Sequence, residues 1–340
     1  MMRRHENGGG QTLKGSSSYN NNNGEEEERI GIGRKWVPKR IIVVRHGESF
    51  ANADVKVFSS TPNHMIKLNP KGIGQARKCG QLIKQLVSEE EDEDWKVFFY
   101  VSPTARTVES LREIGRAFPK RRVVGVKEDH ALREQHFGNY NDPPAIYRIK
   151  DERTTYGRFF YRVPGGEAGC EVYDRISSFV EGLKKDIDAN KFVRGVHDDP
   201  ASESLNLVIV SHGFTARVFL MKWFNWTVEQ FEKLNRMKSS EFQVLQLGKG
   251  GGDYSLAVHH DDAKLMEWGL SAEMIEDQKR RAAGQREYCQ WDTHRFLHLF
   301  RDSEDDDDDD HDIDIHIAAA PPKTPAPAQF NSIQAVDPKC

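Results

Sequence analysis

Two segments of the sequence place a histidine followed by a glycine just after a short apolar run. Arg45-His46-Gly47 follows residues 41–44, and Ser211-His212-Gly213 follows residues 207–210. Runs of this length and composition predict buried strands. An imidazole can act as a nucleophile, and a guanidinium binds two phosphate oxygens at once. Because ligands bind beyond the carboxyl ends of strands in an open α/β sheet, both groups are expected at one binding edge. The alternative is two core strands whose last residues happen to be polar.

The elements that must position these residues alternate between strands and helices. Strands are expected at residues 41–45, 97–101, 123–126 and 207–211, and helices at 72–88, 105–118, 168–187 and from 214. Residues 242–247 and 254–259 are expected to pair as a hairpin, and residues 130–165 to be an insertion with little regular structure. Alternation of this kind predicts an α/β fold with three layers (αβα) and a mostly parallel, doubly wound sheet.

The composition divides the chain into four parts. Residues 1–36 and 303–340 are rich in polar, acidic or Pro/Ala runs and bury too little apolar surface to fold, so both are expected to be disordered tails. Residues 37–262 form the expected catalytic domain, and residues 263–302 a C-terminal helical extension. The apolar stripe of that extension favours packing on the core over presentation to a partner protein.

Charge and cysteine content exclude several classes of protein. The net charge is −4, and no basic stripe suggests a nucleic-acid partner. No apolar segment is long enough for a membrane span. The four cysteines are far apart in the sequence, as is typical of a reducing compartment. The expected location is therefore cytoplasmic, and the nucleus is the alternative. The tails are candidate binding segments for unidentified proteins, and the oligomeric state is left open.

Several blocks of the sequence together resemble the histidine phosphatase superfamily, which includes cofactor-dependent phosphoglycerate mutases and many phosphomonoesterases. Around residues 45–52 the chain reads RHGESFAN, which resembles the family's first loop. Four further blocks follow in the family's order, at residues 68–76, 102–107, 132–138 and 164–167. The segment Tyr156–Arg162 (YGRFFYR) is most similar to small plant and fungal phosphoglycerate-mutase-like proteins.

The resemblance implies a role for individual residues. His46 would attack phosphorus and form a phosphohistidine, and His212 would stand beside the transferred group, preferably protonated. Arg45 and Arg106 would bind the phosphate, with Ser49 and Asn52 as neutral donors. Glu134 would act as general acid, since a carboxyl group next to a phosphate is pushed toward its protonated form. The alternative for Glu134 is an ordinary loop carboxylate paired with Arg133. The family chemistry needs no metal, and the core sequence shows no cluster with metal-ligand spacing. No cofactor is expected for the hydrolysis favoured here.

Departures from the family pattern favour hydrolysis of a small phosphorylated substrate over mutase chemistry. The segment after RHGESFAN lacks the longer Asn-Arg-Phe-x-Gly-Trp stretch typical of mutases, and residues 139–163 lack their adjacent arginine pair. Mutase-type phosphoryl transfer and a phosphate-binding scaffold without activity remain the alternatives. The insertion carries basic and aromatic residues that either form a substrate rim or face water. The candidates for this rim are Tyr147, Arg148, Arg158 and Arg162.

Overall fold

The computed structural model describes residues 37–88, 95–138, 143–193 and 204–285. The two expected disordered tails lie outside the described residues, as does the expected helical extension beyond residue 285.

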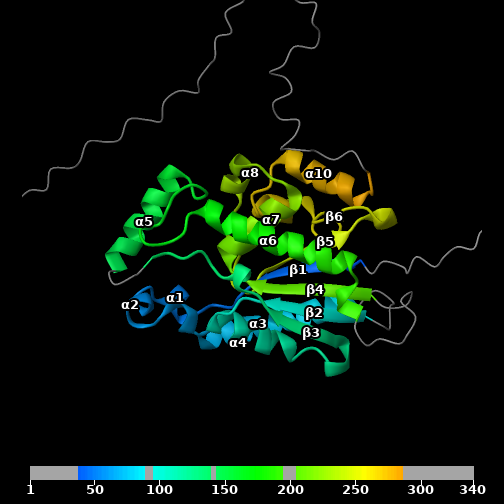
Figure 1. The fold of residues 1–340 in the computed structure, drawn as a ribbon, viewed down its shortest axis with the longest axis horizontal. Helices are drawn as coiled ribbons and strands as arrows, with labels where there is room; N and C mark the ends of the chain where they lie inside the picture. Colours follow the sequence, from blue (N-terminus) through cyan, green and yellow to red (C-terminus); the bar gives the residue numbers. More distant parts are fainter. Residues whose placement is uncertain (1–36, 89–94, 139–142, 194–203, 286–340) are drawn as a thin grey trace, which may run out of the picture. The chain divides into compact units, whose positions relative to one another are not determined.

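A six-stranded mixed sheet forms the centre of the fold (Figure 1). Its strand order is β3-β2-β4-β1-β5-β6. The strands β1, β2, β3 and β4 are mutually parallel. At one edge of the sheet, β5 pairs antiparallel with β1, and β6 pairs antiparallel with β5. The predicted mostly parallel α/β sheet is therefore confirmed. The strands are β1 (Arg40–Arg45), β2 (Trp95–Val101), β3 (Val123–Glu128), β4 (Ser204–Ser211), β5 (Phe242–Leu247) and β6 (Tyr254–Ser255).

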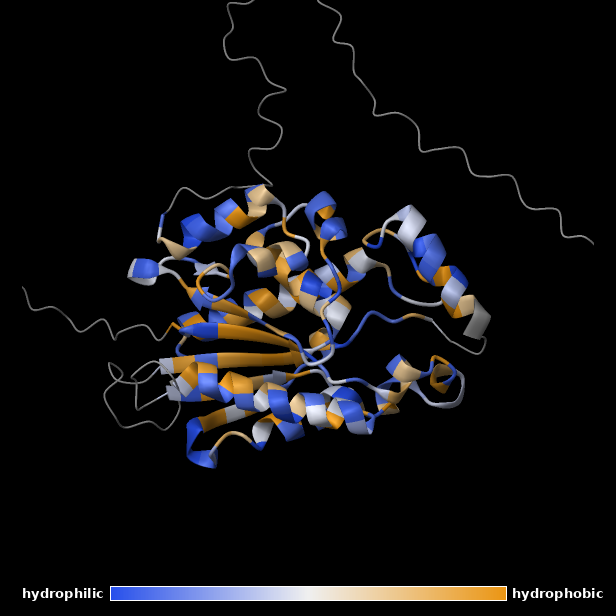
Figure 2. Cartoon of the chain, turned by 180° about the vertical axis from the view of Figure 1, so that it is seen from behind, coloured by the Kyte–Doolittle hydropathy of each residue, from blue (hydrophilic) through white to orange (hydrophobic). Residues whose placement is uncertain are grey.

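Both faces of the central strands are buried, which explains their continuous apolar runs. In β1, Ile41 and Val43 join one hydrophobic cluster, whereas Ile42 and Val44 join the other. Figure 2 shows these strands as the most hydrophobic part of the fold, between helices whose outer faces are hydrophilic. The side chains alternate between the two faces because successive residues of a strand point in opposite directions.

Helices cover the two faces as separate layers (Figure 1). One layer holds α3 (Pro70–Ser88) and α4 (Ala105–Gly115), and the other holds α6 (Gly169–Asp188) and α7 (Gly213–Phe224). The helix α3 buries Ala76, Cys79 and Ile83 at helical spacing. The three-layer αβα arrangement is therefore as predicted.

Short elements collect beyond the carboxyl ends of β1 and β4, and α1, α2 and α5 among them lie at the left of Figure 1. They are α1 (Phe50–Ala53), α2 (Val57–Ser60), η1 (Asn63–Met65), η3 (His130–Leu132) and α5 (Pro143–Tyr156). The expectation of little regular structure at residues 130–165 was wrong, because α5 is a helix of 14 residues. Its inner face carries Ile146, Lys150, Arg153 and Thr154. That face is mostly polar, so the sequence shows no apolar stripe.

The C-terminal part of the domain packs on the side of α6 and α7. The expected hairpin forms, but its second strand, β6, ends at Ser255 because Leu256 N–H donates to Gln278 Oε1 instead of continuing the ladder. Trp268 and Ile275, from the region of α9 (Asp262–Glu267) and α10 (Ala272–Ala282), are buried in the same core as the sheet. Packing on the core is therefore confirmed for this stretch. The remaining short elements are η2 (Lys120–Arg122), η4 (Lys191–Val193), α8 (Val228–Lys233) and η5 (Lys249–Gly251). Within the described residues, none of the helices is both long and apolar enough to cross a membrane.

Candidate active site

The two histidines come together because their strands are neighbours in register. Arg45, the last residue of β1, pairs with Ser211, the last residue of β4, and His46 N–H donates to Ser211 O at 3.0 Å. His46 and His212 therefore leave the sheet at the same level. Their ring centroids lie 5.2 Å apart in an edge-to-face arrangement.

Hydrogen bonding leaves Nε2 of His46 as the ring nitrogen with the available lone pair. The ring nitrogen Nδ1 lies 2.6 Å from Gly47 O. Because a carbonyl oxygen only accepts, Nδ1 carries the proton and Nε2 the lone pair. Burial first, and then the charges of Arg106 and Arg45, hold the pKa of His46 well below its ordinary value of 6.5. The ring is therefore neutral and nucleophilic at neutral pH.

The turn after His46 depends on a close contact between two glycines. A Cβ atom on Gly47 would lie 2.4 Å from Gly72 O, in the first turn of α3. Gly47 N–H also donates to Ser110 Oγ at 3.0 Å. Helices α3 and α4 thereby fix the backbone that carries the nucleophile, and only glycine fits at this position.

His212 is fully buried and interacts with Ser102 at the end of β2. Its Nε2 lies 2.8 Å from Ser102 Oγ, and its buried Nδ1 has no hydrogen-bond partner within the described residues. Burial, followed by the charges of Arg106 and His46, lowers the pKa of His212 well below 6.5. This differs from the expectation of a protonated His212, because the ring is shielded from water and surrounded by guanidinium groups. A neutral ring that accepts from Ser102 O–H still presents Nδ1–H as a donor.

Arg45 and Arg106 are both buried and are oriented by backbone carbonyls. Arg45 donates to Met237 O, and Arg106 donates to Asn63 O at 2.8 Å and to Asn63 Oδ1 at 3.1 Å. Burial is the main cause that lowers the pKa of each arginine to about 10, so both remain charged at neutral pH. Two fixed guanidinium groups next to a neutral imidazole form a site for a phosphate dianion.

The side chains of Ser49 and Asn52, the two predicted neutral donors, stabilise the start of α1. Ser49 N–H donates to Asn52 Oδ1, and Asn52 N–H donates to Ser49 Oγ, which together make a capping box. Both residues line the same cavity as His46. Their donors are therefore held at the edge of the site by local structure.

Glu134 lies at the N-terminus of α7, close to the two histidines. Its carboxylate accepts from Thr215 N at 3.3 Å, from Thr215 Oγ1 at 3.1 Å and from Phe214 N at 3.4 Å. The first turn of a helix leaves its N–H groups without backbone partners, so a carboxylate is stabilised there. The expected alternative for Glu134, a pair with Arg133, is not what forms, because Arg133 binds Glu167.

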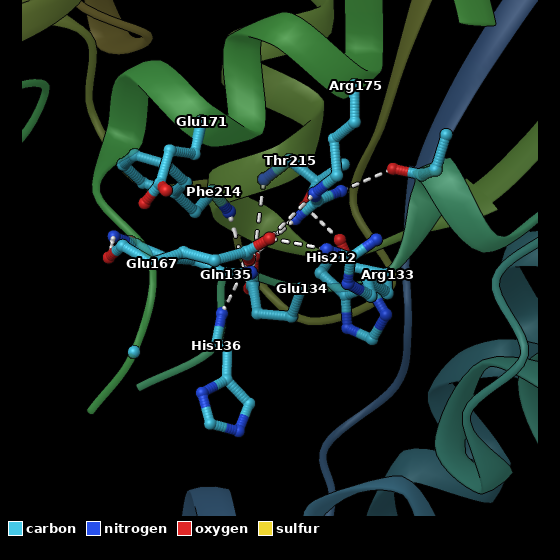
Figure 3. A network of polar contacts seen from close by, with 12 residues as sticks. Arg133, Glu134, Gln135, His136, Glu167, Glu171, Arg175, His212, Phe214 and Thr215 are labelled. Carbon is cyan, nitrogen blue, oxygen red and sulfur yellow. Dashed lines mark hydrogen bonds and ion pairs between the residues drawn. The ribbon is translucent and has the colours of Figure 1, made fainter. Parts of the chain in front are cut away.

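Glu167 fixes the segment that carries Glu134 (Figure 3). Its carboxylate accepts from His136 N at 2.9 Å and pairs with Arg133 at 2.5 Å and Arg175 at 3.2 Å. Its backbone carbonyl also accepts from Gln135 Nε2. Residues 133–136 are therefore tied to the start of α6 on both sides of Glu134.

A cavity of about 420 Å³ is lined by His46, Arg106 and Glu134. A second cavity of about 720 Å³ shares Phe58, Asn63 and Glu134 with it. Within the described ranges, no group of three or more His, Cys, Asp or Glu residues could hold a metal ion. The first cavity is lined by His46, Ser49, Ala51, Asn52, Val55, Phe58, Asn63, Arg106, Glu134, Phe137, Ile146, Lys150, Arg153, Thr154, Arg158, Phe214, Arg217 and Arg236.

Only one of the four candidate rim residues lines this cavity. Arg158 does, whereas Arg148 pairs with Glu152 at 4.0 Å and Arg162 pairs with Glu171 at 2.8 Å, both with exposed side chains. Tyr147 is also exposed, and its ring contacts Lys150 Nζ. These three residues of the insertion do not line the cavity.

The sequence predictions missed several cavity residues, foremost Arg217 and Arg236. Arg217 stands one helical turn after Gly213, so the i, i+4 rule applied to Ser211-His212-Gly213 would have found it. Arg236 and Asn63 lie in a loop and a short 3-10 element without a recognisable pattern. Only the three-dimensional packing brings them to the site.

Several known proteins are similar to this chain. Residues 41–260 match the family model of the histidine phosphatase superfamily (branch 1). A phosphoglycerate mutase-like protein of Arabidopsis thaliana is 50% identical over 275 residues, covering 79% of this chain and 85% of the relative. A broad-range acid phosphatase of Saccharomyces cerevisiae is 27% identical over 307 residues, covering 64% of this chain and 88% of the relative. Among solved structures, YhfR of Bacillus stearothermophilus aligns with a TM-score of 0.47 and 19% identity, covering 65% of this chain and 96% of that one.

The family model spans more than half of the chain, and its matched residues include both strand-histidine-glycine segments and Glu134. The chain belongs to the histidine phosphatase superfamily, branch 1.

Proposed function

We propose that this protein hydrolyses phosphomonoesters through a phosphohistidine intermediate on His46. One observation carries the proposal. The neutral ring of His46, with Nδ1 held by Gly47 O, lies beside His212, and both His46 and Glu134 line one cavity with Arg106. Nucleophile, cationic donors and a proton donor are thus present together, as phosphoryl transfer requires.

In the first step, Nε2 of His46 attacks phosphorus and the bond from phosphorus to the leaving oxygen breaks. Arg45 and Arg106 bind the non-bridging oxygens and neutralise their charge. His212 donates a hydrogen bond from Nδ1 to the same group. The phosphate dianion bound next to Glu134 favours the protonated carboxyl, which then gives its proton to the leaving oxygen, and this oxygen departs as an alcohol.

In the second step, water attacks phosphorus on the opposite side from His46. The carboxylate of Glu134 takes a proton from this water, and the bond from phosphorus to Nε2 breaks, which releases inorganic phosphate. Glu134 also lines the second cavity, from which water can approach it. This access supports hydrolysis, as does the acid phosphatase activity named for the yeast relative.

Mutase-type transfer is the second candidate, favoured by the large number of cationic side chains in the cavity. A mutase returns the phosphoryl group to a second position of a bound product and must keep water away from the phosphohistidine. The cationic lining would hold such a product by its remaining charged group. The same experiment separates this candidate from hydrolysis.

The test is a panel of phosphomonoesters that includes an aryl phosphate and 3-phosphoglycerate with 2,3-bisphosphoglycerate. Free phosphate and 2-phosphoglycerate are both measured, with His46→Ala as the control. Phosphate release that disappears in the variant supports the proposal. Formation of the isomer favours the mutase, and absence of both products favours a phosphate-binding scaffold.

A further inference from the structure

We propose that Glu241 is a positioning residue, whose carboxylate fixes the loop that orients the guanidinium of Arg45 and the backbone of His46. The loop comprises residues 235–241, between α8 and β5, and is here called the 235–241 loop. Glu241 itself does not line the cavity that holds His46. The inference rests on the proposed function only in taking Arg45 as a ligand of phosphate.

Three hydrogen bonds join the 235–241 loop to Arg45 and His46. The guanidinium of Arg45 donates from Nη1 to Met237 O, and the backbone N–H of Arg45 donates to Glu241 O at 3.0 Å. Ser240 N–H donates to His46 O at 3.2 Å. The phosphate-binding side chain and the backbone of the proposed nucleophile therefore both depend on the position of this loop.

The 235–241 loop has a backbone conformation that its own sequence does not favour. Ser240 has a φ of +57°, in the left-handed region that residues other than glycine rarely adopt. Its Oγ is buried and has no hydrogen-bond partner within the described part of the chain. Both features cost free energy, so other contacts of the loop must hold Ser240 in place.

The carboxylate of Glu241 makes such contacts on both of its oxygens. Oε2 accepts from Lys238 N–H at 2.6 Å, which closes the loop on itself. Oε1 accepts from Lys264 Nζ at 2.8 Å and from Trp268 Nε1 at 2.9 Å. Lys264 lies on α9 and Trp268 directly follows it, with its ring buried in the same core as the sheet. One side chain therefore joins the closed loop to a helix that is packed on the core.

The charge of Glu241 supports the same arrangement. Burial by itself raises the pKa of Glu241, but the hydrogen bonds from Lys264 and Trp268 outweigh it, so the pKa is lowered from 4.5 and the group is charged at neutral pH. Burial lowers the pKa of Arg45, and the charge of Glu241 acts in the opposite direction. Glu241 thus favours the charged guanidinium while its own oxygens are bound by other donors.

Glutamine at this position cannot reproduce the contacts of the carboxylate. A side-chain amide has one acceptor oxygen and an NH2 group that only donates. In Glu241→Gln, either Lys238 N–H or the pair of Lys264 and Trp268 would face this NH2 group, so the loop loses one of its ties. Arg45 would then be less firmly oriented before phosphate binds, which weakens binding.

The test measures the affinity for inorganic phosphate by 31P NMR titration, which needs no turnover. The control is Asp262→Asn, because Asp262 also lies on α9 but pairs with Lys279 of α10. We expect Glu241→Gln to raise the Kd for phosphate at least about tenfold, and Asp262→Asn to change it less than about twofold. Equal Kd values in the three proteins, or no phosphate binding by the original chain, would overturn the inference.

A double-mutant cycle shows whether Glu241 acts through Arg45. In the Arg45→Ala background the group that Glu241 positions is gone, so Glu241→Gln should change the Kd for phosphate less than about threefold. A rise in Kd as large as in the original background would mean that Glu241 only supports the fold. That result would overturn the positioning role.

A second variant, Lys264→Met, keeps the inference testable if Glu241→Gln does not fold. It removes one donor to Glu241 Oε1, and the side chain of Lys264 is 32% exposed, so the core stays intact. We expect the Kd for phosphate to rise about threefold, because the other two donors remain. An unchanged Kd would overturn the inference. Weaker phosphate binding by the variants, with no phosphate release from any compound by the original chain, would instead contradict the proposed function and leave the positioning role standing.

Discussion

The rings of His46 and His212 lie 5.2 Å apart because β1 and β4 pair in parallel with Arg45 opposite Ser211. A slip of one residue in this register would turn one of the two histidines to the other face of the sheet. The register is set by apolar side chains on both faces of both strands. The packing of the core therefore determines the geometry of the histidine pair.

Glu134→Gln should separate substrates by their leaving groups. An alkyl alcohol needs a proton as it departs, whereas a nitrophenolate leaves readily without one. We expect single-turnover phosphorylation of His46 by an alkyl phosphate to slow by about 100-fold or more, and that by p-nitrophenyl phosphate to change little. Rapid-quench kinetics measure both rates. Equal slowing with the two substrates would contradict the role of Glu134 as general acid.

His46 should remain neutral in weakly acidic solution. Burial and the nearby arginines lower its pKa below 6.5, so the folded protein resists protonation of this ring as pH falls through that value. The unfolded chain does take up the proton, so His46 makes the free energy of unfolding decrease as pH falls below 6.5. NMR titration of 15N-labelled histidine, assigned with His46→Asn, checks this. A titration midpoint at or above 6.5 would contradict it.

Gly47→Ala should damage both stability and activity. The added Cβ would lie 2.4 Å from Gly72 O, so β1 or α3 must move. We expect a loss of about 1–3 kcal/mol in the free energy of unfolding, as is typical of overpacking, and a strong loss of turnover. Chemical denaturation measures the first effect. Gly74→Ala is the matched control, because a Cβ there meets no atom within 4 Å.

Glu167→Gln should weaken the protein in a pH-dependent way. Burial by itself raises the pKa of Glu167, but the hydrogen bonds from His136 N–H and Arg175 outweigh it, so the pKa is lowered from 4.5. Its contribution to stability is therefore present above 4.5 and is lost as pH falls through the lowered value. We expect the variant to lose about 1–3 kcal/mol near neutral pH, and the difference from the original chain to shrink below pH 4. A constant difference across this range would contradict the ion-pair account.

Residue patterns predicted the sheet and the inner site, but not the outer cavity. Apolar runs such as Leu207–Val210 predict a buried strand, and the polar residues that follow the run predict its carboxyl end. Helix α5 was not predicted because the face that lines the cavity carries Lys150 and Arg153 instead of an apolar stripe. Arg236 comes to the site only through the packing of a loop after α8, which no local pattern records.

The most direct test of the central claim is to trap the covalent intermediate. The protein is mixed with a 32P-labelled phosphomonoester from the panel, quenched in alkali, digested and analysed by mass spectrometry. The account predicts an alkali-stable, acid-labile phosphate on His46, absent from His46→Ala. Label on another residue, or undiminished phosphate release by His46→Ala, would contradict it.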